Sequence, residues 1–184
     1  MRHSFTTTFR PGFLAGLSCY SPEGFFLTMP QLSLHSPLGP LTLSEEDGAI
    51  LSLDWGWGRD QTETPLLSQA CAWLDTWFDD PAAQGAFPFP LAPFGTTYQK
   101  KVWSALCAIP VGQTLTYGAL AAQVGGSAQS IGQALGRNPI PILIPCHRVV
   151  SRQGLGGYSG DGGVEDKAWL LTLEGADFPG KEKA

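Results

Sequence analysis

A thiol, an imidazole and a guanidinium occupy three consecutive positions in the second half of the chain. The segment 144–149 reads IPCHRV, which places Cys146, His147 and Arg148 side by side. Positively charged neighbours favour the thiolate, the nucleophilic form of cysteine, so the triplet indicates a nucleophile beside a base. The apolar run 140–144 acts in the opposite direction, because burial raises the pKa of a thiol. The two effects oppose each other, and residues adjacent in sequence need not be hydrogen-bond partners, so the pattern alone leaves the ionisation state of Cys146 open.

The other cysteines lack such neighbours. Cys19, Cys71 and Cys107 are far apart and lie in an N-terminal extension or in helical patterns without a polar partner, so we expect buried, inert thiols. Four widely spaced cysteines in 184 residues do not form the dense disulfide framework of a small secreted domain, which favours reduced thiols in the cytoplasm. His3, Cys19 and His35 are not spaced as metal ligands, so we expect no metal; a zinc site in the N-terminal part is the less favoured alternative.

The composition excludes some classes of protein and leaves a nucleic-acid partner open. Hydrophobic residues make up 43% of the chain, enough for a core, which excludes wholesale disorder. No run approaches the roughly 18 apolar residues of a membrane span, so we expect no membrane partner. The net charge is −5, yet no acidic residue occurs between Asp80 and Asp161. That stretch contains the cations Lys100, Lys101, Arg137, Arg148 and Arg152. An acid-free surface with five cations can approach DNA without like-charge repulsion.

The elements that must position these residues differ between the two halves of the chain. In the first half, alternating apolar residues predict three antiparallel strands at 31–36, 41–44 and 49–55, and helical spacing predicts an amphipathic helix over 66–78. The proline-rich run that follows predicts a linker packed on the surface. The domain organisation we expect is a loosely ordered extension at 1–29, an N-terminal domain at 30–80, a linker at 81–94, a C-terminal domain at 95–178 and a tail at 179–184.

The second half contains a pattern of short capped helices. A helix beginning near Tyr98 is predicted to end before Pro110. Thr116 can cap a helix over 117–124, and Ser127 can cap another over 128–135. Two short helices joined by a glycine-containing turn are typical of a helix-turn-helix, although many helical domains that bind no DNA contain one.

Taken together, these segments resemble the O6-alkylguanine-DNA alkyltransferases, also called methylated-DNA–protein-cysteine methyltransferases. The matching segments are, in chain order, 98–103, 109–112, 116–121, 137–139, 144–149, 157–160 and 170–175. The likeness is close over 94–176 and holds in outline over 31–80. It implies an α/β (α+β) fold: a small ribonuclease H-like antiparallel sheet with helices in the N-terminal domain, and a mostly helical C-terminal domain with a winged-helix-like helix-turn-helix.

The resemblance also implies an activity. Such a protein repairs DNA by direct damage reversal: it rotates the alkylated nucleotide out of the duplex through the minor groove and moves the alkyl group irreversibly to its own cysteine. A base inside the stack cannot present its O6 substituent to a buried sulfur, so base flipping is physically required. The implied partner is double-stranded DNA carrying O6-alkylguanine, with activity on O4-alkylthymine left open. The resemblance implies no cofactor and no metal, and a cytoplasmic monomer.

The resemblance further implies a role for individual residues. Cys146 is the nucleophile, His147 draws its proton through a water molecule, and Glu174 orients the imidazole. Asn138 braces the turn beside the thiol, and Tyr117 pushes on the target phosphate and supplies a proton to the departing guanine. The implied substrate-binding residues are Pro141, Val149, Tyr158, Ser159, Gly160 and Lys167. The implied DNA-binding residues are Tyr117, Ser127, Ala128, Gln129, Ser130, Gly132 and Arg137.

One position departs from the family pattern. Gln129 stands where these proteins usually have an arginine that inserts into the duplex and fills the space of the rotated base. Glutamine is shorter and has no planar cation to stack on bases and attract phosphates. We therefore expect weaker DNA binding than is usual for the family.

Three other interpretations compete with this one. A cysteine hydrolase built on Cys146 and His147 would have to regenerate its thiol, and nothing in the sequence specifies an oxyanion hole. A non-catalytic damage-recognition protein of the same fold would lack the reactive cysteine, which is present here. A transcriptional regulator built around the helix-turn-helix would need the additional cysteine-rich domains of dual-function relatives. A stand-alone repair protein is the favoured interpretation.

Overall fold

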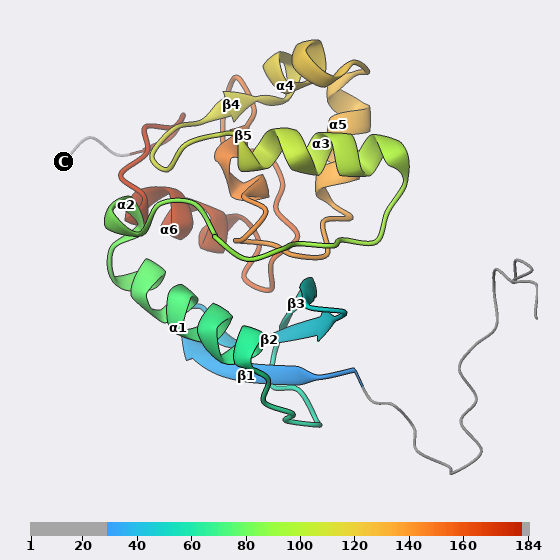
Figure 1. Cartoon of the computed structure of the whole chain (residues 1–184). Helices are drawn as coiled ribbons and strands as arrows, with labels where there is room; N and C mark the ends of the chain where they lie inside the picture. The colour runs from blue at the N-terminus through green and yellow to red at the C-terminus, as the bar shows by residue number, and fades with distance from the viewer. Residues whose placement is uncertain (1–28, 182–184) are drawn as a thin grey trace, which may run out of the picture.

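Strands β1 (Gln31–Ser36), β2 (Gly39–Glu46) and β3 (Ala49–Trp55) form an antiparallel meander in the computed structural model, which describes residues 29–181 (Figure 1). Leu41 pairs with Leu34 on one side and Trp55 on the other, so the register places apolar side chains on a common face of the sheet. The tight turn before β3 contains Gly48 at φ 75°, a conformation that glycine adopts without strain. The three strands predicted from the alternating pattern are confirmed.

Helix α1 (Pro65–Asp79) covers one face of this sheet, against β1 and β2 (Figure 1). Thr64 caps it by accepting a hydrogen bond from the Leu67 amide, and Pro65 occupies the first turn, where its missing N–H leaves no bond unmade. Leu67, Leu74 and Trp77 are buried at the helical spacing that the sequence predicts.

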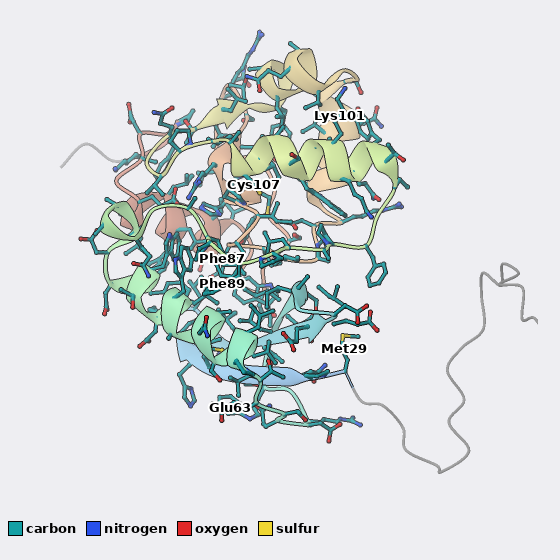
Figure 2. All side chains as sticks on the ribbon, viewed as in Figure 1. Met29, Glu63, Phe87, Phe89, Lys101 and Cys107 are labelled. Atoms are coloured by element: carbon teal, nitrogen blue, oxygen red, sulfur yellow. The ribbon has the colours of Figure 1, made fainter. Side chains whose placement is uncertain are left out.

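The segment after α1 ties the two halves of the chain together along β3. It begins with a short helix α2 (Pro81–Gln84), which sequence reasoning did not predict. The Ile50 amide then donates to Pro90 O at 2.9 Å, and the Ala92 amide donates to Ile50 O at 2.9 Å. Figure 2 shows Phe87 and Phe89 of this segment between α1 and the C-terminal half, and their rings contact each other edge to face. The linker therefore pairs with the β3 edge of the sheet at Ile50.

The second half consists of short helices with two very short strands. The elements are α3 (Thr97–Cys107), β4 (Leu115–Thr116), α4 (Tyr117–Val124), α5 (Ala128–Leu135), the 3-10 helix η1 (Cys146–Arg148), β5 (Val149–Val150) and α6 (Val164–Leu173). Thr116 caps α4 and Ser127 caps α5, as predicted. The Trp103 indole N–H donates to Ala134 O at 2.9 Å and fastens α3 to α5. Within residues 29–181, no helix is both long and apolar enough to cross a membrane.

A parallel pairing of β4 with β5 brings distant parts of the second half together. Leu115 pairs with Val149, and Thr116 pairs with Val150. Because α4 begins directly after β4 and η1 ends directly before β5, this pairing places Tyr117 near Cys146. Two-residue strands leave no alternating pattern, so the sequence does not predict this contact.

Candidate active site

Cys146 lies at the start of η1, at the end of a tightly folded segment. The Asn138 side chain donates to Ile144 O at 2.8 Å and accepts from the Ile140 amide at 3.1 Å, which closes the loop before the cysteine. Inside that loop Ile142 has φ 71°, a conformation that costs a β-branched residue about 1–3 kcal/mol. The packed segment holds Cys146 in place with 3% of its surface exposed.

His147 points its imidazole at Glu174, which caps the C-terminus of α6. The distance from His147 Nε2 to Glu174 Oε1 is 2.9 Å, and neither side chain is accessible to solvent. Because an ionised carboxylate can only accept, Nε2 carries the proton and Nδ1 holds a free electron pair. Burial lowers the pKa of His147, which keeps the imidazole neutral. Nδ1 has no hydrogen-bond partner among residues 29–181, so it is free to act as a base.

Arg148 holds the same carboxylate from its other side. Its Nε donates to Glu174 Oε2 at 2.9 Å, its NH2 group donates to Oε1 at 2.7 Å, and its NH1 group donates to Ile109 O. Burial by itself raises the pKa of Glu174, but the hydrogen bonds and charges of His147 and Arg148 outweigh it and bring that pKa down to about 2. Glu174 is therefore ionised at any physiological pH. Sequence reasoning did not assign Arg148 this role.

The thiol itself is neutral at rest. Burial raises the pKa of Cys146 and outweighs the hydrogen bond from Asn138 and the positive charge of Lys167, which both lower it. The cations adjacent in sequence therefore do not bring the pKa of this thiol below that of a free thiol. The cation next in sequence, Arg148, directs its guanidinium to Glu174. Removal of the thiol proton must accompany the reaction.

A cavity of about 370 Å³ opens onto Cys146. It is lined by Tyr117, Gly132, Leu135, Gly136, Cys146, Gly157, Tyr158 and Ser159. Five of these belong to the sets predicted from the sequence, namely Tyr117, Gly132, Cys146, Tyr158 and Ser159. Four of the predicted substrate-binding residues do not line the cavity, namely Pro141, Val149, Gly160 and Lys167.

Lys167 is the clearest example of a residue behind the wall. It is fully buried, and its Nζ donates to Val149 O at 2.6 Å and to Gly157 O at 3.0 Å. The Tyr117 hydroxyl donates to the same Gly157 carbonyl at 3.4 Å. Burial lowers the pKa of Lys167 to about 8, and the charge of a Cys146 thiolate would raise it. The amine thus joins β5 to the loop that forms one wall of the cavity.

The predicted DNA-binding residues cluster at the exposed start of α5. Ser127, Ala128 and Gln129 are exposed, and so is Arg137 beyond the end of the helix. Ser130 is different: its hydroxyl accepts from the Ser127 amide at 2.9 Å and lies 2.8 Å from the hydroxyl of Tyr98 on α3. Tyr98, which was not predicted as a site residue, also donates to Gly125 O and so anchors the turn between α4 and α5.

The predictions for three side chains are wrong, and a fourth residue lies outside the described residues. Cys107 is exposed at the end of α3 (Figure 2), because the helix turns this position outward, and Cys71 is only half-buried. Arg148 is buried with Glu174, so four of the five predicted cations remain on the surface. Cys19 lies in the segment that the structure does not describe. Over residues 29–181, no three His, Cys, Asp or Glu side chains gather as a metal site requires.

Fold and site together define a class of protein: an exposed pair of helices lies beside a pocket that ends at a buried cysteine with a histidine–glutamate base.

Comparison with known proteins identifies the family to which such a site belongs. Residues 97–176 match the family model described as 6-O-methylguanine DNA methyltransferase, DNA binding domain. Methylated-DNA–protein-cysteine methyltransferase of Methanosarcina barkeri is 38% identical over 152 residues, which cover 77% of this chain and 94% of the relative. The constitutive enzyme of Bacillus subtilis is 38% identical over 80% of this chain and 95% of its own.

Solved structures of methyltransferases are also similar to this chain. Mycobacterium tuberculosis OGT in complex with DNA matches with a TM-score of 0.67 and 37% identity, over 78% of this chain and 92% of that one. A crystal structure of the O6-methylguanine methyltransferase of the same organism matches with a TM-score of 0.69 and 32% identity, over 84% of this chain and 97% of that one. The mixed α/β architecture with a small antiparallel sheet is shared with these structures. The chain belongs to the methylated-DNA–protein-cysteine methyltransferase family.

Proposed function

We propose that this protein repairs DNA by moving the alkyl group from O6 of an alkylated guanine to Sγ of Cys146, once per molecule. The observation that carries the proposal is the buried row of Cys146, His147 and Glu174 at the end of an open cavity, in which Nδ1 of the neutral imidazole is free to accept a proton. Membership in the methyltransferase family supports it.

The reaction follows from these protonation states. His147 takes the thiol proton through a water molecule, and the ionised Glu174 stabilises the imidazolium that forms. Sγ then attacks the alkyl carbon, so that the S–C bond forms as the C–O6 bond breaks and the electron pair leaves with guanine. Tyr117, on the cavity wall, gives the departing guanine a proton, which the imidazolium restores. The product is a neutral guanine and a thioether, which no group of the site is placed to cleave, so the protein stops after one turnover.

The guanine must leave the duplex to reach this sulfur. Cys146 is 3% exposed, and a stacked base cannot bring its O6 substituent to it. We assign the exposed start of α5, with Ala128 and Gln129, to the minor groove, and the cavity to the rotated base. The Ser159 hydroxyl and nearby amides are suited to bind O6. The carbonyl of Cys146, a cavity residue, already accepts one bond and keeps a lone pair for the guanine amine. Val149 does not line the cavity, and its carbonyl accepts from Lys167.

The finer assignments are part of the same proposal. We assign the sheet with α1 to a ribonuclease H-like N-terminal domain over 30–80, and the helices and short strands over 95–178 to a winged-helix-like DNA-binding domain, with the linker at 81–94 between them. We expect the protein to act as a monomer on double-stranded DNA. A cytoplasmic location is supported by Cys71, Cys107 and Cys146, which form no disulfide within residues 29–181.

The stoichiometry of transfer tests the proposal. The protein is incubated with an excess of duplex DNA that carries O6-methylguanine with a tritiated methyl group. We expect protein-bound label to reach a plateau at one equivalent, with none on the Cys146→Ser variant and a full equivalent on Cys107→Ser, the control that removes an exposed thiol. Release of label beyond one equivalent would overturn the proposal in favour of a cysteine hydrolase.

A further inference from the structure

We propose that Trp55, at the end of β3 in the N-terminal sheet, limits the size of the alkyl group that the cavity accepts. The inference rests on the proposed function and adds a specificity-determining residue from outside the cavity. Trp55 acts through the cavity wall and does not touch the substrate, so it is a positioning residue.

The contact that carries the inference is made at Gly160. A Cβ atom placed on Gly160 would stand 2.9 Å from Trp55 Cζ2 and would also collide with the Tyr158 ring. Gly160 therefore lies against both aromatic side chains, with room for hydrogen only. Tyr158 lines the cavity, so Trp55, which does not, packs at the outer side of the loop that forms this wall.

Packing holds the Tyr158 side chain in this part of the wall. The backbone of the loop is fastened at Gly157, whose carbonyl accepts from Lys167 and Tyr117, and at Gly160, whose carbonyl accepts from the Gly163 amide at 3.0 Å. Between these points the buried Tyr158 hydroxyl has no hydrogen-bond partner in the part of the chain that the structure describes. The position of the Tyr158 ring is thus determined by the groups packed around it, and the Trp55 indole at Gly160 is one of them.

Trp55 itself sits on a rigid support that is tied to the active-site segment. It pairs with Leu41 of the central strand, and two residues earlier the Leu53 amide donates to Pro139 O at 2.9 Å. Pro139 directly follows Asn138, the residue that closes the loop before Cys146. The sheet and the cysteine are therefore held in one framework.

A smaller side chain at position 55 should enlarge the cavity on the Tyr158 side. A methyl group needs none of this space, whereas a benzyl group does. We expect Trp55→Ala to raise the rate of transfer from O6-benzylguanine relative to that from O6-methylguanine by about tenfold, the scale on which a change in hydrophobic pocket size alters selectivity. Trp55→Phe, which keeps a narrower ring, should shift the ratio in the same direction by less.

The experiment measures single-turnover rates on two duplexes, one with O6-methylguanine and one with O6-benzylguanine, for the wild type and three variants. The matched control is Trp57→Ala, which removes an indole two residues away that is 53% exposed and stacks on His35. Iodoacetamide alkylation of Cys146 reports whether the thiol environment is intact. We expect the rate ratio to change at saturating DNA in both Trp55 variants, with Cys146 alkylation and the Trp57→Ala ratio as in the wild type.

The outcomes separate the inference from the function on which it rests. If the wild type transfers neither group to Cys146, the proposed function is wrong. If the wild type transfers both, but the ratio in the Trp55 variants is unchanged or changes equally in Trp57→Ala, the size-limiting role of Trp55 is overturned. Should Trp55→Ala fail to fold, Trp55→Phe decides the question by the same criterion.

Discussion

Replacing Glu174 with glutamine removes the charge on which both His147 and Arg148 depend, while keeping the shape of the side chain. The wild-type carboxyl has its pKa lowered from 4.5 to about 2. At 1.36 kcal/mol per pKa unit, that shift corresponds to about 3 kcal/mol of folding free energy at neutral pH. The variant should lose a similar amount, because Arg148 keeps a buried charge without a carboxylate partner.

The sign of the pH dependence follows from the direction of the shift. Since the pKa of Glu174 is lower in the folded protein, its contribution is complete above about pH 5 and is lost as the pH falls from 4.5 toward 2. His147, whose pKa is lowered by burial, makes the folded state less stable below pH 6.5. Because the hydrogen bond and the charge of Glu174 raise that pKa, this loss is larger in the variant. The difference between the two unfolding free energies is therefore clearest at pH 7, where both imidazoles are neutral.

Urea unfolding followed by tryptophan fluorescence measures this difference at pH 7, 4.5 and 3. We expect the wild type to exceed Glu174→Gln by about 3 kcal/mol at pH 7. Below about pH 5, protonation of Glu174 narrows this gap, whereas the larger loss from His147 in the variant opposes the narrowing. Glu165→Gln, on the exposed first turn of α6, is the control for the loss of a carboxylate. Equal stability of the wild type and Glu174→Gln at pH 7 would refute the argument that Glu174 is held ionised by its two partners. The same variant should transfer methyl groups about 100-fold more slowly, since general base catalysis typically contributes at least that much.

Three further predictions concern neighbouring residues. Gln129→Arg should tighten binding to damaged and undamaged duplexes alike and steepen the salt dependence by about one unit of slope, with no change in the reaction with free O6-benzylguanine; an unchanged slope in a salt titration would mean that α5 does not lie in the groove. Arg148→Lys should slow transfer about tenfold, because one ammonium cannot bind both Glu174 oxygens and Ile109 O together; a wild-type rate in single-turnover assays would contradict this. Iodoacetamide should alkylate Cys146 at pH 7 more slowly than free cysteine, since burial raises the thiol pKa; a faster rate would show that the resting thiol is ionised.

Sequence reasoning worked where structure is determined locally. Thr116 and Ser127 each cap the helix that follows them, because a hydroxyl one residue before a helix meets an unpaired amide inside its first turn. The meander over 31–55 likewise follows from alternation and turn residues. The resemblance carried by residues 144–149 pointed to Cys146 and Glu174, which no local pattern links.

The contacts that the sequence did not indicate are between distant residues and depend on burial. Arg148 meets Glu174 across 26 positions, and the sequence alone indicates only one more surface cation there. Lys167 lies on a helix whose other charges, Glu165 and Asp166, are exposed or half-buried. Its burial depends on the carbonyls of Val149 on β5 and of Gly157 on the wall loop, which accept its hydrogen bonds. Trp55 ends a strand as a half-buried aromatic residue, and its contact with the wall loop at Gly160 follows from how the sheet packs on the second half of the chain.

The central claim is that Cys146 is the acceptor of the alkyl group, and peptide mass mapping tests it most directly. The protein is incubated with one equivalent of duplex DNA that carries O6-methylguanine, digested, and analysed by tandem mass spectrometry. The account predicts that the peptide containing Cys146 gains the mass of one CH₂ group, that the peptides of Cys71 and Cys107 gain nothing, and that the Cys146→Ser protein is unmodified. A methyl group found on Cys107, or guanine restored in the DNA with no mass gained by the protein, would contradict it.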